Sequence, residues 1–299
     1  MKDMCNADVG VELPRFEPVA KNIYRLKIPL LTMWTSVVLV RKGGKNVLID
    51  SGKTAADVDG YIVPALGAFG LGPTDIDVLL ATHTHWDHIG GHVRLRELGV
   101  GKVAVYEKGY PKLCDPKTYQ EKMFWEFREN SAADLPYLEG LKADITLHDG
   151  EEIAGLRLIA TPGHDDDTVS FLEPDSSVLI AGDSLQGIGI EVLGCAFYRY
   201  LPEYEDSVKR LQMMNIGTVL FSHPTPPWTG TVTSGEIVFA ETLGFIRLYD
   251  ELLKQQTPKP LAESAVELIR QLGGQVPSHL VLAMYTVREH LRRLGLSFE

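Results

Sequence analysis

The stretch "LLATHTHWDHIGGH" at residues 79–92 decides the fold assignment, because it places four of the chain's nine histidines directly behind an apolar run. Side chains two apart on an extended segment point the same way, so His83 and His85 share a face. Asp87 and His88 follow where the chain turns into a helix. Burying several imidazoles without partners is costly, and a metal ion removes that cost because imidazole and carboxylate are zinc-type ligands. The stretch therefore predicts a metal site.

Three further polar residues stand at the ends of apolar runs that read as strands. "LRLIATPGH" ends at His164, "SVLIAGD" at Asp183 and "GTVLFSH" at His223. A lone histidine is more often structural, but this ordered set favours a shared metal site. The predicted metal ligands are His83, His85, Asp87, His88, His164, Asp183 and His223.

The arrangement of apolar runs predicts an α/β protein. Up to about residue 223, short strand-like runs alternate with helical stretches at 55–69, 89–98 and 203–214. A faint internal echo accompanies them: "NVLIDSG" resembles "SVLIAGDS", and "DVLLATH" resembles "TVLFSH", in the same order. Chance similarity between Val/Leu strands is the alternative. Two related half-sheets that meet at their polar strand ends would explain the echo.

Two segments depart from this pattern. After Thr231 the periodicity is helical, which predicts a C-terminal helical extension over 231–299 behind a catalytic domain over 20–230. Residues 107–143 interrupt the first half, and "YQEKMFWEFREN" within them predicts a helical insert with an apolar stripe. Apolar residues in both segments must be buried. We expect them to narrow the metal cleft, and a dimer contact made by the C-terminal helices is the competing interpretation.

Composition narrows the functional classes. The chain has 299 residues and a net charge of -11, so it gains little from counterion release on nucleic acid, and we expect no nucleic-acid partner. No run reaches the roughly 18 consecutive apolar residues of a membrane helix, and the start does not resemble a signal peptide. Three widely spaced cysteines favour reduced thiols. We therefore expect a cytoplasmic protein without a membrane partner.

The motifs "THTHWDHIGG", "TPGH", "AGDS" and "SHP" resemble those of the metallo-β-lactamase-fold superfamily of metal-dependent hydrolases, over roughly residues 20–225. The resemblance implies an α/β fold, an αββα four-layer sandwich of two similar halves followed here by the helical extension. It also implies two metal ions, for which we expect zinc, with iron or manganese as alternatives. Carried over by position, one ion is held by His83, His85 and His164, the other by Asp87, His88 and His223, and Asp183 bridges them. Asp50 matches a family position whose side chain supports a metal ligand without binding the metal itself.

The resemblance implies hydrolysis by a metal-bound hydroxide. Asp183 at the bridging position argues against a β-lactamase, so we expect a small ester, thioester or lactone as substrate. Asp87 and Asp183 are the predicted catalytic carboxylates, with Asp183 moving the proton. Tyr198 is a candidate oxyanion donor, although a plain hydrophobic anchor is an equal alternative. The alternative functions are a metal-containing regulatory or signal-response protein with weak thioesterase activity, and a phosphodiesterase.

The remaining polar residues receive simpler interpretations. We expect surface or capping roles for His92, His148, His279 and His290. Arg288, Arg292 and Arg293 are available to grip a substrate, but a solvated helix face is favoured. The run Asp165–Asp167 is expected to make the rim of the site acidic.

Overall fold

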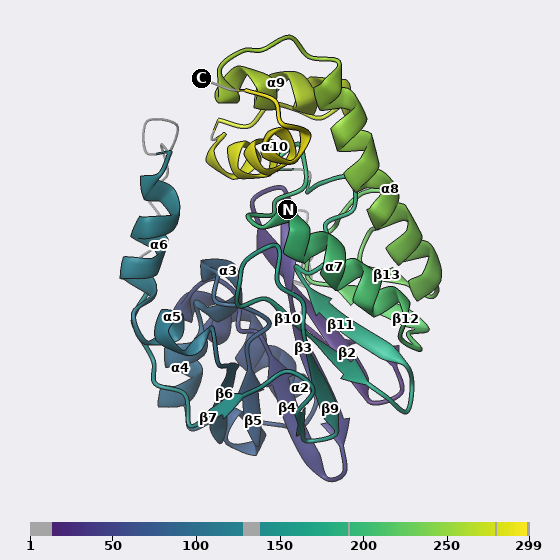
Figure 1. The fold of residues 1–299 in the computed structure, drawn as a ribbon. Coiled ribbons are helices and arrows are strands. Elements are labelled where there is room, and N and C mark those ends of the chain that lie inside the picture. The colour runs from purple at the N-terminus through teal and green to yellow at the C-terminus, as the bar shows by residue number, and fades with distance from the viewer. Residues whose placement is uncertain (1–13, 128–137, 191, 279, 298–299) are drawn as a thin grey trace, which may run out of the picture.

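The computed structural model describes residues 14–127, 138–190, 192–278 and 280–297, and these form two mixed sheets packed face to face (Figure 1). The seven-stranded sheet has the order β1 (Glu17–Ala20), β2 (Ile23–Leu30), β3 (Met33–Lys42), β4 (Lys45–Ile49), β5 (Val78–Leu80), β6 (Lys102–Tyr106) and β7 (Ile145–Leu147). The six-stranded sheet has the order β13 (Thr231–Val232), β12 (Thr218–Phe221), β11 (Val178–Gly182), β10 (Val169–Glu173), β9 (Leu156–Ala160) and β8 (Glu152–Ile153).

Helices cover the outer face of each sheet. The first half carries α1 (Ala55–Asp57), a π-helical turn η1 (Val58–Ile62), α2 (Val63–Ala68), η2 (Pro73–Asp75), α3 (Trp86–Ile89), α4 (His92–Glu97), α5 (Tyr110–Cys114) and α6 (Pro116–Trp125). The second half carries α7 (Leu201–Gln212), α8 (Gly235–Lys254), α9 (Leu261–Gln271) and α10 (Val281–Leu294). No helix within the described ranges is long and apolar enough to cross a membrane.

Side-chain alternation along the central strands produces the four layers. In β4, Val47 and Ile49 point into the apolar core between the sheets, whereas Leu48 points into the core under the helices of the first half. In β11, Ile180 faces the core between the sheets and Leu179 faces a third core under α7 to α10. Strands buried on both faces need helices on the outside. The αββα sandwich and its helical extension are therefore confirmed.

The internal echo corresponds to equivalent strands in the two sheets. β4 pairs with β5 in parallel, and β11 pairs with β12 in parallel. Asp50 and Asp183 follow the first strand of each pair, and the second strands lead to His83 and His223. Because parallel strands end at the same edge, each half delivers its polar residues to one end of the sandwich.

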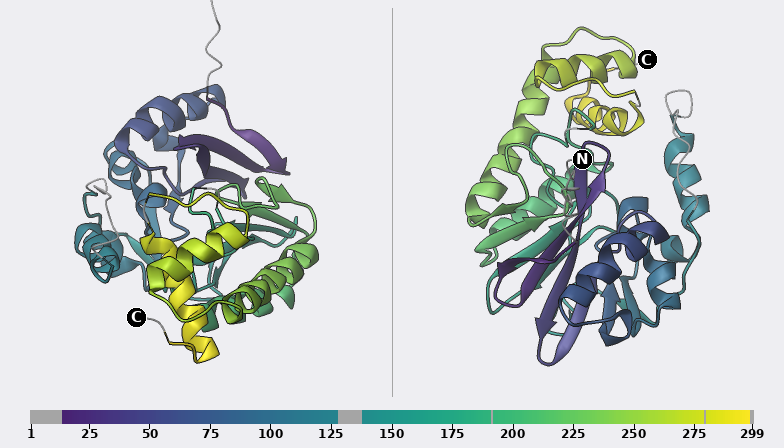
Figure 2. Two further views of the ribbon diagram at one scale, coloured as in Figure 1. Left: turned by 90° about the horizontal axis from the view of Figure 1, so that it is seen from above. Right: turned by 180° about the vertical axis from the view of Figure 1, so that it is seen from behind.

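The C-terminal helices are part of the core of the second half. Leu268 and Ile269 of α9 and Val287 and Leu291 of α10 are buried in the core under α7 and α8. Figures 1 and 2 show α9 and α10 beyond one end of the sandwich, connected to it by the long helix α8. β13 pairs with β12, so the sheet continues into the first two residues after the predicted boundary at residue 230. The division into 20–230 and 231–299 stays a prediction.

Candidate metal centre

The structure brings all seven predicted ligands together at the end of the sandwich. His83 and His85 come from the turn between β5 and α3, Asp87 and His88 come from α3 itself, and the other three follow β9, β11 and β12. Their ligating atoms lie within 4.8 Å of one another in three overlapping groups: His83, His85 and His164; His83, His88 and Asp183; and Asp87, His88 and His223. We call the first of these groups the first set and the last the second set. Every member except the partly exposed Asp87 is buried.

Hydrogen bonds behind the first set fix the tautomers of two rings. His85 places Nε2 at 3.1 Å from Asp165 Oδ2, and His164 places Nδ1 at 2.8 Å from the Phe197 carbonyl oxygen. A carboxylate and a carbonyl only accept, so both ring nitrogens donate. The opposite nitrogens, His85 Nδ1 and His164 Nε2, then carry lone pairs and face each other at 3.0 Å.

The second set repeats this arrangement. His88 Nδ1 donates to Asp50 Oδ2 at 2.8 Å, and His223 Nδ1 donates to the Trp34 carbonyl oxygen at 3.0 Å. The inner Nε2 atoms of these two histidines lie 3.2 Å apart. Two facing lone pairs repel each other unless a proton or a cation lies near both.

His83 completes the pattern. Thr82 Oγ1 donates to Asp50 Oδ2 at 2.9 Å and therefore accepts from His83 Nδ1 at 3.1 Å. The inner Nε2 of His83 is buried and has no hydrogen-bond partner. Burial lowers the pKa of His83 well below its usual value, which keeps the ring neutral. Five histidines thus turn their inner ring nitrogens toward the interior of the centre, and this donor set fits metal cations.

Asp183 faces both sets at once. Its Oδ1 lies 3.4 Å from His223 Nε2, and its Oδ2 lies 3.5 Å from His164 Nε2. A carboxylate that offers one oxygen to each set suits the bridging role expected for it. Gly182, at φ 55°, allows this approach, because a Cβ there would lie 2.7 Å from Thr82 Cβ.

Asp87 lies on the side of the second set, with Oδ2 3.3 Å from His223 Nε2. Burial raises the pKa of the Asp87 carboxyl, but the charges of His88 and His223 outweigh burial and bring it to about 2. Asp87 is therefore ionised, as a metal ligand must be.

The sequence identified one of the residues that support the ligands and left the others unpredicted. Asp50 was expected to support a ligand, and it does accept from His88. The carbonyls of Trp34 and Phe197 left no signal, because any residue type supplies one. Asp165 did leave a signal, since it directly follows His164. The prediction that Asp165–Asp167 form an acidic rim is wrong: Asp165 and Asp167 are buried, and Lys112 pairs with all three carboxylates.

The catalytic role predicted for Tyr198 is wrong. Its ring is buried, stacks on Tyr204 with centroids 4.4 Å apart, and belongs to the core under α7 to α10. Its hydroxyl is hydrogen-bonded to His290 Nε2 at 2.5 Å, and His290 Nδ1 is hydrogen-bonded to Asp250. The hydroxyl is therefore held inside the core. His290 is fully buried, so its predicted surface role is also wrong.

The other histidine predictions have mixed outcomes. His92 is buried with Nδ1 2.7 Å from Ser51 Oγ, so a surface role is wrong for it as well. His148 pairs with Glu107 while both side chains stay exposed, as expected. His279 lies outside the described residues.

The insert and the last helix pack on each other beside the first set. Met123 of α6 and Tyr285 of α10 join Phe197 in a small apolar cluster, and the Tyr285 hydroxyl donates to the Met123 carbonyl. The Phe197 ring lies 4.8 Å from the His164 ring. Arg288 is buried over Tyr285, at 4.9 Å from the ring centroid, so the solvated face predicted for it is wrong. The two segments thus border the metal centre.

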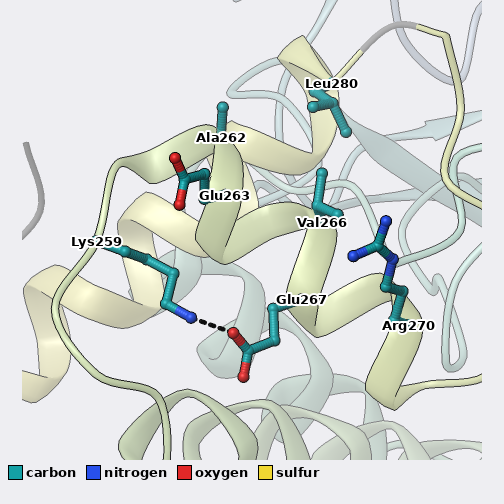
Figure 3. Close-up of a pocket in the computed structure, with 7 residues that line it drawn as sticks. All are labelled: Lys259, Ala262, Glu263, Val266, Glu267, Arg270 and Leu280. Atoms are coloured by element: carbon teal, nitrogen blue, oxygen red, sulfur yellow. Dashed lines mark hydrogen bonds and ion pairs between the residues drawn. The ribbon is translucent and has the colours of Figure 1, made fainter.

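A separate pocket lies on the outer face of α9 (Figure 3). It has a volume of about 580 Å³ and is lined by Lys259, Ala262, Glu263, Val266, Glu267, Arg270 and Leu280. None of these residues belongs to the metal centre. Lys259 pairs with Glu267 along this face. The homodimer contact expected from the C-terminal helices stays a prediction.

Comparison with known proteins decides the family. Residues 35–223 match the family described as the metallo-beta-lactamase superfamily. The chain belongs to this superfamily. Superfamily relatives include the beta-lactamase-like protein 2 homolog of Drosophila melanogaster, 25% identical over 87% of this chain and 82% of the relative. The homolog of Caenorhabditis elegans is also 25% identical, over 65% of this chain and 57% of its own length. The hydroxyacylglutathione hydrolase of Methylococcus capsulatus is 27% identical over 57% of each protein.

Solved structures of the superfamily share the fold. A metallo-beta-lactamase family protein from Thermus thermophilus superposes with a TM-score of 0.74 at 22% identity, covering 93% of this chain and 95% of that one. A beta-lactamase domain protein from Burkholderia ambifaria gives a TM-score of 0.71 at 18% identity, covering 96% and 90%. Both cover the C-terminal helices as well as the sandwich. The superfamily consists largely of metal-dependent hydrolases, and the His/Asp clusters could hold metal here.

Proposed function

We propose that the protein is a binuclear metal-dependent hydrolase of a small ester, thioester or lactone. The observation that carries the proposal is the inward orientation of five histidine nitrogens around Asp183, each fixed by an acceptor behind the ring. Two relatives described as hydroxyacylglutathione hydrolases, 27% and 28% identical, support acyl transfer to water.

The two sets would each hold one ion, with Asp183 between them. Bound divalent metals would supply a nucleophile at neutral pH, by lowering the pKa of water, and would polarise the carbonyl under attack. Mixed imidazole and carboxylate donors suit zinc, which we propose for both sites, with iron and manganese as the alternatives. Elemental analysis of the purified chain tests this, and a stoichiometry near one metal per chain contradicts it.

The chain's own residues supply the proton transfers and the shape of the site. Asp183 and Asp87 are ionised carboxylates that face the interior of the centre, so they can accept a proton and return it to the leaving group. The Phe197 ring against His164 gives one border of the centre an apolar surface. This border, together with the packed insert and α10, favours a small and partly apolar substrate over a polymer. A small-molecule substrate without a nucleic-acid or membrane partner is part of the proposal.

Hydrolysis of a panel of thioesters, lactones, simple esters and phosphodiesters tests the reaction. We expect turnover of one carboxylic-acid derivative that disappears after metal removal and in Asp183→Asn. The control Asp175→Asn should retain it, because Asp175 is an exposed acid in the turn between β10 and β11. Preference for phosphodiesters would establish the phosphodiesterase alternative. Metal binding without turnover on any class would favour the regulatory alternative and contradict the proposal.

A further inference from the structure

Two buried carboxylates hold the segment that carries His83 and His85. Asp165 Oδ2 accepts from His85 Nε2 at 3.1 Å. Asp167 Oδ2 accepts from the backbone nitrogen of Thr84 at 3.0 Å and from its hydroxyl at 2.7 Å. Thr84 lies between the two histidines. One carboxylate therefore fixes a ligand ring, and the other fixes the backbone from which two ligands of the first set project.

Lys112 of α5 connects these two carboxylates. Its ammonium lies 3.1 Å from Asp165 Oδ1 and 2.8 Å from Asp167 Oδ1, which are the oxygens not hydrogen-bonded to His85 and Thr84. The Lys112 side chain is about nine-tenths buried, and both carboxylates are fully buried. Buried charges persist only when they are paired. The pairing explains how three consecutive aspartates can lie beside a metal centre.

The insert supplies a second contact to the same carboxylate. Tyr119 of α6 donates to Asp165 Oδ2, and its oxygen accepts from Lys112 at 2.9 Å and from Arg199 at 2.7 Å. Arg199 Nη1 also lies 3.1 Å from Asp165 Oδ1. Asp165 is therefore surrounded by donors from three segments, which leaves its carboxylate a single orientation toward His85.

We propose that Asp165 and Asp167 are positioning residues for the first set, and that Lys112 holds both, so that helices α5 and α6 determine how tightly this set binds its ion. The inference rests on the proposed function, because it assigns the network to the metal centre described there. A ligand ring that is free to rotate or to change tautomer binds metal less tightly, and loss of such a supporting partner typically costs about 10- to 100-fold in affinity.

Chelator competition on the full chain tests the proposal. We expect Asp165→Ala to weaken one of the two ions by about 10- to 100-fold and to leave the other unchanged. Asp165→Asn, which retains an acceptor for His85, should restore most of the affinity. Lys112→Met should weaken the same ion. Asp166→Ala is the matched control, because Asp166 contacts Lys112 but no ligand residue, and it should leave both affinities unchanged.

Spectroscopy identifies the affected site. In the cadmium-loaded chain, Asp165→Ala should shift the cadmium resonance of the first set alone, whereas Asp50→Asn should shift the resonances of both sets, because Asp50 accepts from His88 and from Thr82, which is bonded to His83. In the metal-free chain, nitrogen NMR should show His85 protonated at Nε2 in the wild type and a tautomer mixture in Asp165→Ala.

Three results would overturn the proposal: equal losses in Asp165→Ala and Asp166→Ala, weakening of both ions together with a lower melting temperature, or an unchanged His85 tautomer. A wild-type chain that binds no divalent metal would refute the proposed function instead. The tautomer measurement would then decide the positioning role by itself, since it needs no metal.

Discussion

Replacing Tyr198 by phenylalanine separates a catalytic tyrosine from a core tyrosine. The substitution removes only the hydroxyl, which is bonded to His290 Nε2 at 2.5 Å inside the core under α7 to α10. The buried His290 nitrogen then loses its partner, and an unsatisfied buried acceptor costs about 1–3 kcal/mol. We therefore expect Tyr198→Phe to lower the free energy of unfolding by that amount.

The catalytic alternative predicts a different magnitude in a different quantity. Loss of an oxyanion donor lowers kcat by about 100- to 1000-fold with little effect on stability. We instead expect kcat within about twofold of wild type, since the hydroxyl is far inside the core, and a melting temperature lower by roughly 2–10 °C. The assay combines denaturant unfolding with turnover of whichever ester or thioester the wild type hydrolyses.

Two controls sharpen the result. Tyr200→Phe removes a hydroxyl from a partly exposed ring in the same loop and should change stability little. His290→Leu should cost less in the Tyr198→Phe background than in the wild type, because the first substitution has already removed the shared bond. A large fall in kcat at unchanged stability would refute the reasoning and reinstate Tyr198 as a catalytic residue.

Three further outcomes are expected. Gly163→Ala should lower the free energy of unfolding by roughly 3 kcal/mol, because φ is 145° and a Cβ would lie 2.4 Å from Tyr204 Cα. Gly273→Ala, at φ 76° with open space around it, should lower it by only about 1–2 kcal/mol. Equal losses in the two variants would contradict the packing argument. Burial lowers the pKa of His290 despite the neighbouring Asp250. In mildly acidic solution the unfolded chain therefore binds a proton that the folded chain does not, and the free energy of unfolding should fall as pH drops below about 6.5. A His290→Leu variant that shows the same dependence of stability on pH in urea unfolding would disprove this. Removing metal should lower the free energy of unfolding by about 2.7 kcal/mol for each bound ion, relative to protein held at a free metal concentration 100 times Kd. Unchanged melting would mean that the histidines bind no ion.

The fold and the seven clustered residues could be predicted because their signals are local. Short apolar runs mark strands such as β4, and the clustered residues lie at or just after the ends of such runs. The sequence echo could be read because equivalent strands need similar apolar residues at equivalent positions. The order and spacing of the motifs then predicted that these residues meet at one edge of the sandwich.

The errors concern residues whose surroundings depend on distant segments. Tyr198 and His290 are 92 positions apart, and no local pattern shows that their side chains meet. Asp165 reads as a solvent-exposed acid until Lys112, 53 positions earlier, is placed beside it. Arg288 has an ordinary helix-surface spacing, and only the packing of the insert against α10 buries it. Tertiary contacts of this kind decide whether a charged residue is solvated or structural.

The two halves of the sandwich both contribute predicted ligands to each ion, which gives the metal centre a mechanical role. His83 and His85 come from the first half and His164 from the second, while Asp87 and His88 come from the first half and His223 from the second. Each ion would therefore cross-link one half of the sandwich to the other. Away from the ions, the two halves contact each other through the apolar core between the two sheets. Metal removal should then separate the halves at the metal end first, and amide hydrogens at the ends of β5 and β12 should exchange sooner than those in the middle of either sheet.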